Sequence, residues 1–125
     1  MNIPENLKYT EEHEWAGKEG DVVLVGISDY AQGELGDMVY VELPSVGDHF
    51  EQNDVFGSVE AVKAAADLYC PLAGEILEVN GNLQDTPEIV NKDPYGKGWM
   101  IKLKLDNPAD FENLMDAAAY KQHIG

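Results

Sequence analysis

Lys63 is the residue of this chain whose surroundings best suit chemistry on a side chain. It lies between two strand-like runs, Val55 to Val62 and Leu68 to Cys70, so the sequence places it at or near a hairpin tip. Its neighbours Ala61 and Ala64 to Ala66 are small and leave the ε-amine open to a large partner. The pKa of an exposed lysine is about 10.4, so the amine becomes a nucleophile only when a partner removes its proton.

Two plainer interpretations of Lys63 follow from the same residues. Lysine is mostly a solvated surface residue, and spacing alone favours that interpretation. The alanine run could also form a helix, because alanine is the best helix former. Such a helix would be very short, since Pro71 and Gly74 follow closely.

Other candidate chemistries have less support from the sequence. The three histidines, His13, His49 and His123, are widely scattered and lack the spacing of a metal-ligand set, so we predict no metal site. His13, which is close to Trp15 in the sequence, is expected to pack or hydrogen-bond near a surface cleft. The single cysteine, Cys70, cannot form an internal disulfide and is typical of a small buried residue in a reducing compartment. The sequence shows no recognisable pair of a nucleophile and a general base. This argues against a hydrolase and against catalytic residues in general.

The charge balance excludes two classes of partner. The chain has 125 residues, with 24 acidic and 8 basic ones, and its formal net charge is -16. Nucleic acids and anionic membranes need a basic patch, which this chain cannot build. The length predicts a single domain over residues 1–125. The start of the chain shows no signal peptide, which favours the bacterial cytoplasm and leaves a mature mitochondrial form open.

The pattern of the chain is mainly β. Strands are expected over 21–27, 38–43, 55–62, 68–70, 74–79 and 99–105. A short helix is expected near 28–35, capped by Ser28 and ended by Gly36. A longer helix is expected at about 108–121, where Pro108 occupies the first position and an apolar stripe follows at Phe111, Leu114, Met115 and Ala118.

Several segments resemble one known family in the family's own order. Glu60 to Ala64 with Asp67 to Ile76 resembles the lipoyl-attachment segment of the glycine cleavage system H protein family. The same resemblance extends to the segments Tyr9 to Trp15, Val25 to Gln32, Leu35 to Pro44 and Pro94 to Ile101. It covers residues from about 3 to 121, and it is therefore more specific than a lone motif.

The resemblance implies a fold and a modification. The fold would be a barrel-sandwich hybrid of the lipoyl and biotinyl carrier type, built from two small antiparallel sheets, with a lipoyl-binding core at about 22–104. Lys63 would carry lipoic acid in amide linkage. Biotin carriers usually place methionine on both sides of the lysine, whereas Val62 and Ala64 flank it here, which favours lipoyl over biotinyl.

The resemblance also implies the partners and the cargo. The chain would be a carrier and not an enzyme. It would take the aminomethyl group of glycine from a pyridoxal-phosphate glycine decarboxylase to a tetrahydrofolate-dependent aminomethyltransferase. A dihydrolipoamide dehydrogenase would reoxidise the arm, and a lipoate-attaching enzyme would load Lys63.

The loaded arm would rest in a surface cleft whose matching positions are Glu12, Glu14 and Asp67. Carboxylates there would pair with the cationic amine. Asp67 could instead be only a turn residue, and Glu14 only part of an acidic surface. Glu12 departs from the family, which usually has a small hydroxyl residue there.

Two other functions fit the sequence. One is an H-like lipoyl carrier that donates lipoyl groups to other complexes. The other is an unmodified acidic interaction domain.

Overall fold

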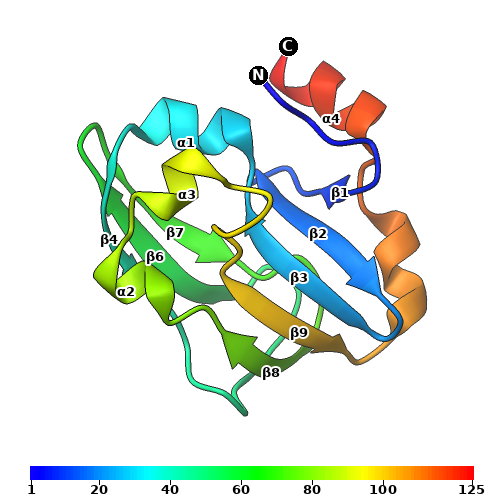
Figure 1. Ribbon diagram of the computed structural model, residues 1–125. Helices are drawn as coiled ribbons and strands as arrows, with labels where there is room; N and C mark the ends of the chain where they lie inside the picture. The colour runs from blue at the N-terminus through cyan, green and yellow to red at the C-terminus, as the bar shows by residue number, and fades with distance from the viewer.

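Two antiparallel sheets form the body of the protein, as predicted. The computed structural model describes all residues, 1–125. The larger sheet has six strands in the order β1 (Lys8–Tyr9), β2 (Glu14–Glu19), β3 (Val22–Ile27), β9 (Ile101–Leu105), β8 (Gly74–Val79) and β5 (His49–Phe50). The smaller sheet has the order β4 (Met38–Glu42), β6 (Val55–Ala61) and β7 (Ala65–Tyr69). Figure 1 shows the two sheets facing one another.

The core lies between the inner faces of these sheets. Twenty buried residues form one apolar cluster, to which both sheets contribute. Val23 and Val25 of β3 and Leu103 of β9 are fully buried members from the larger sheet, and Val59 of β6 is a fully buried member from the smaller sheet. The alternation of buried and exposed residues along β9 follows the two-residue period of a strand with one face on the core.

The first helix has the ends that its sequence predicts. In α1 (Asp29–Leu35) the Ser28 side chain accepts a hydrogen bond from the Ala31 N–H. Gly36 ends the helix with a φ of 83°, a value that favours glycine. Two further short helices, α2 (Asn82–Asp85) and α3 (Ile89–Lys92), were not expected. They lie beside the smaller sheet in Figure 1, and α3 contacts α1.

The C-terminal helix is present, but its predicted extent was wrong. Residues Pro108–Asn113 form a 3₁₀ helix (η1), and the α-helix α4 spans Ala117–Ile124. The interruption is caused by a β-bridge, in which Tyr9 N–H donates to Met115 C=O at 2.8 Å and Met115 N–H donates to Tyr9 C=O at 3.0 Å. Asp116 then caps α4.

A second apolar cluster follows from this interruption. It is formed by Tyr9, Trp15, Ala117 and Tyr120 and ties α4 to β1 and β2. The rings of Tyr9 and Tyr120 stack with centroids 4.6 Å apart. Ala118, which the predicted stripe placed on the packed face, is exposed.

The β6–β7 hairpin confirms that Lys63 lies at a tip. The alanine run after Lys63 is extended, because Ala65 and Ala66 pair with Glu60 and Val59 in the sheet, and it does not form a helix. The turn closes with Ala61 N–H donating to Ala64 C=O at 2.9 Å. No helix of the protein is long and apolar enough to cross a membrane.

Candidate functional site

The hairpin tip is held against the end of α1. Lys63 N–H donates to Leu35 C=O at 3.0 Å, and Val62 N–H donates to Asp37 C=O at 2.9 Å. Figure 1 shows the tip beside the segment that joins α1 to β4. The side chain of Lys63 is exposed, and its Nζ makes no hydrogen bond or ion pair. The backbone of this lysine is therefore fixed, while its amine is free.

A cavity of about 480 Å³ opens between α1, the start of β2 and the β6–β7 hairpin. Its thirteen lining residues are Glu12, His13, Glu14, Ile27, Tyr30, Ala31, Glu34, Leu35, Val59, Ala66, Asp67, Leu68 and Tyr69. The fold thus brings the three predicted carboxylates, Glu12, Glu14 and Asp67, together around one cavity. Lys63 does not line it, but the strands of its hairpin form part of the wall.

Glu14 is the buried acid of this cavity, with only 1% of the residue exposed. Thr10 Oγ1 donates to its Oε1 at 2.6 Å, and Tyr69 N–H donates to its Oε2 at 3.4 Å. Burial raises the pKa of Glu14 to about 8, although the hydrogen bonds from Thr10 and Tyr69 oppose the shift and nearby Glu12 adds to it. The side chain is therefore mostly protonated at pH 7.

The other acids of the cavity face water. Glu12 and Asp67 are exposed, and so is Glu34, which the sequence reasoning missed. Glu34 lies on α1 one turn after Tyr30, and both line the cavity. That spacing of four residues is the signal that could have identified Glu34, because positions i and i+4 share one face of a helix.

His13 packs and hydrogen-bonds at the cavity, as predicted. Its backbone has a φ of 75°, which is uncommon outside glycine. The ring lies 5.0 Å from the Tyr30 ring, and Nδ1 lies 2.9 Å from the Tyr120 hydroxyl. Burial lowers the pKa of His13, and nearby His123 lowers it further. The structure thus brings two histidines together that are far apart in the sequence.

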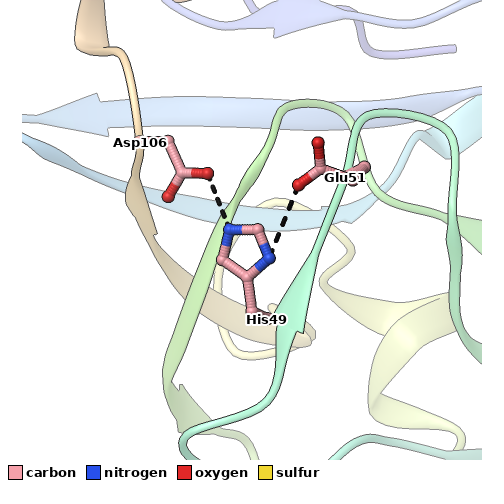
Figure 2. A group of neighbouring side chains, drawn as sticks. All are labelled: His49, Glu51 and Asp106. Carbon is pink, nitrogen blue, oxygen red and sulfur yellow. Dashed lines mark hydrogen bonds and ion pairs between the residues drawn. The ribbon is translucent and has the colours of Figure 1, made fainter.

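The third histidine lies at a different place, which Figure 2 shows. His49 Nε2 is 2.6 Å from Asp106 Oδ2, and Nδ1 is 3.5 Å from Glu51 Oε2. Its pKa is raised, first by the hydrogen bond to Asp106. All three residues are exposed. Because the carboxylates face different ring nitrogens, this arrangement suits a protonated imidazole between two acids better than three ligands of one metal ion.

The architecture and the comparisons identify the family in turn. Two antiparallel sheets that carry a lysine on a hairpin tip form the barrel-sandwich fold of lipoyl and biotinyl carrier proteins. The sequence profile described as "Glycine cleavage H-protein" matches residues 7–125. The chain belongs to this family.

Curated relatives and a solved structure agree with that assignment. The glycine cleavage system H protein of Bacteroides fragilis is 56% identical over 97% of this chain and 96% of its own length. That of Laribacter hongkongensis is 58% identical over 99% of this chain and 98% of its own length. The crystal structure of a glycine cleavage system H protein from Mycobacterium marinum superposes with a TM-score of 0.90 at 36% identity, and the match covers 98% of this chain and 99% of that one.

Proposed function

We propose that this chain is the lipoylated shuttle of a glycine cleavage system and does not itself catalyse a step. It would carry the aminomethyl group of glycine from the decarboxylase to the aminomethyltransferase. The observation that carries the proposal is the Lys63 tip, where a fixed backbone presents a free amine.

Lys63 fits the attachment of a large acyl group. Its side chain is exposed and its neighbours on both sides, Val62 and Ala64, are exposed too. Nζ makes no hydrogen bond or ion pair with a side chain that could remove its proton, so we expect the lipoate-attaching enzyme to supply the base. The lipoyl group, once bound there, would supply the sulfur chemistry that takes up the aminomethyl group.

The cavity fits a cationic cargo. Without cargo, its buried acid is mostly neutral at pH 7, because burial raises the pKa of Glu14 to about 8. An ammonium group beside Glu14 would favour the charged carboxylate and lower the pKa of that side chain. The exposed carboxylates of Glu12, Glu34 and Asp67 at the same cavity would attract the cation. Buried Glu14 would then hold and shield it.

Family membership supports the partners that the sequence predicts, namely glycine decarboxylase, aminomethyltransferase, dihydrolipoamide dehydrogenase and a lipoate-attaching enzyme. It supports neither a lipoyl donor for other complexes nor an unmodified interaction domain. The relatives named above are bacterial, in keeping with a bacterial cytoplasmic protein.

Intact mass spectrometry with peptide mapping tests the proposal. Protein from its natural host, and protein treated with a lipoate-attaching enzyme, should gain the mass of one lipoyl amide on Lys63. Lys63→Arg should abolish the gain, whereas Lys97→Arg, at another exposed lysine, should retain it. An unmodified protein from the host would overturn the proposal. An assay of glycine-dependent carbon dioxide exchange with the decarboxylase distinguishes the two carrier functions. A shuttle should support the exchange, whereas a carrier that only donates lipoyl groups should not.

A further inference from the structure

The segment after α1 connects the hairpin tip to the rest of the fold. The carbonyls of Leu35 and Asp37 accept the hydrogen bonds of Lys63 N–H and Val62 N–H. These are the backbone hydrogen bonds that join the turn at Lys63 to another part of the chain. The position of Lys63 therefore depends on the position of residues 35–37.

The side chain of Asn91, in α3, also forms hydrogen bonds with this segment. Its Nδ2 donates to Gly36 C=O at 2.9 Å, and its Oδ1 accepts from Met38 N–H at 2.9 Å. Nδ2 also donates to Gln32 Oε1 of α1 at 3.0 Å. The side chain thus brackets residues 36–38 and ties them to two helices.

The bracketed segment has a conformation that needs support. Gly36 has a φ of 83°, in the region that other residues rarely adopt. The side chain of Lys63 packs closely on it, since a Cβ added at Gly36 would lie 3.2 Å from Lys63 Cγ. A small rearrangement at Gly36 would therefore move both the backbone and the side-chain stem of Lys63.

We propose that Asn91 is a positioning residue for modification of Lys63, acting through residues 35–38. This inference rests on the proposed function, because it concerns the lysine that the attaching enzyme would acylate. Acyl transfer needs the amine within about 3–3.5 Å of the reacting carbon in a defined direction. An amine on a hairpin tip whose position fluctuates therefore reacts more slowly. Asn91 reaches the tip only through the backbone and touches no reacting atom.

The chain offers a matched control in Asn80. Its Nδ2 donates to Lys97 C=O and to Trp99 C=O, both at 2.8 Å, and its Oδ1 accepts from Asn82 N–H at 3.3 Å. Asn80 is 4% exposed and brackets a loop of the larger sheet. Its replacement should destabilise the protein at least as much as replacement of Asn91 without loosening the Lys63 tip.

The first measurement is amide hydrogen exchange of the unmodified protein. Asn91→Ala should speed exchange of the Val62 and Lys63 amides about tenfold, because their acceptors lie on the released segment. The Ala61 amide, whose acceptor Ala64 lies within the hairpin, should change less. Asn80→Ala should leave all three amides unchanged. Unchanged exchange at Val62 and Lys63 in folded Asn91→Ala would overturn the inference.

The second measurement is the kinetics of lipoylation with a lipoate-attaching enzyme. Asn91→Ala should lower kcat/KM about tenfold relative to Asn80→Ala. Asn91→Asp keeps the acceptor for Met38 N–H but loses both donated hydrogen bonds, so its kcat/KM should lie between those of wild type and Asn91→Ala. If Asn91→Ala does not fold, Asn91→Asp takes its place in the comparison. Equal rates for the Asn91 and Asn80 variants would overturn the inference. A wild-type protein that is never lipoylated would overturn the proposed function instead, and the exchange data would still decide whether Asn91 holds the tip.

Discussion

The hairpin tip and the cavity give their ionisable side chains opposite environments, exposed at the tip and buried in the cavity. At the tip, the backbone of Lys63 is anchored while its side chain is exposed and free of partners. In the cavity, Glu14 is 1% exposed, hydrogen-bonded at both oxygens and mostly neutral at pH 7. Under the proposed function, Lys63 is modified by another enzyme and needs only to be presented, whereas Glu14 would meet the cargo and has its charge adjusted by burial. Exposing the side chain of Lys63 costs the folded protein little stability, whereas burying the carboxyl group of Glu14 costs more.

The largest expected effect is the pH dependence that Glu14 gives to stability. Burial raises the pKa of Glu14 from 4.5 to about 8, so between these values the native state binds more protons than the unfolded chain. The contribution of Glu14 to stability therefore falls as the pH rises through this window and is lowest above pH 8. The loss should be of the order of a few kcal/mol.

Glu14→Gln should remove that loss, and denaturant unfolding from pH 5 to 9 would measure it. The difference between variant and wild-type profiles cancels the histidine titrations, including those of His13 and His49. Asp67→Asn is the matched control, because it removes an exposed acid from the same cavity and should leave the slope unchanged. Equal slopes for Glu14→Gln and wild type would show that the cavity does not alter the charge of Glu14.

Gly36→Ala should give the next largest effect, and it acts on the tip. The φ of 83° and the 3.2 Å approach to Lys63 Cγ both oppose a Cβ. We expect a loss of about 1–3 kcal/mol in the free energy of unfolding, the usual cost of such backbone strain. Gly33→Ala is the control, since a Cβ there meets no atom within 4 Å. Equal stability of the two variants would contradict the requirement for glycine at position 36.

The difference between tip and cavity also decides what the sequence alone could predict. Local signals were enough to predict that Lys63 lies at a tip and where α1 begins and ends: small residues around Lys63, the Ser28 cap and Gly36 after the helix. The state of Glu14 depends on Tyr69, 55 residues away in the chain, and on enclosure by the hairpin and α1. The family resemblance implied that Glu14 lies at a cleft, but no local pattern could show that it is buried and mostly neutral.

The C-terminal segment shows the same limit. The apolar stripe through Phe111, Leu114 and Met115 predicts one continuous helix, yet Met115 pairs with Tyr9 instead. Tyr9 lies more than 100 residues earlier, so no local pattern announces the bridge. Two backbone hydrogen bonds and a stacked pair of tyrosines outweigh the helical preference of a few residues.

A smaller effect is expected on the lifetime of the loaded arm. Glu14→Ala should make the aminomethyl-loaded protein decay faster to formaldehyde and ammonia, by about tenfold, if loss of the buried carboxyl costs about 1.4 kcal/mol of shielding. Formaldehyde release from the isolated loaded protein measures this rate. Glu34→Ala should have a weaker effect, because Glu34 is exposed. Unchanged decay in Glu14→Ala would remove Glu14 from the arm-binding site.

The smallest effect is expected where function depends most on one residue. Lys63→Ala should change the free energy of unfolding by less than about 0.5 kcal/mol, as is usual for exposed surface positions, while abolishing lipoylation. The backbone bonds from residue 63 to Leu35 and from residue 62 to Asp37 remain available to alanine, so the tip should keep its position. Urea unfolding of the unmodified proteins tests this. A loss above 1 kcal/mol would mean that packing of the Lys63 side-chain stem on Gly36 stabilises the fold. The side chain at the tip, like that of Glu14 in the cavity, would then affect stability.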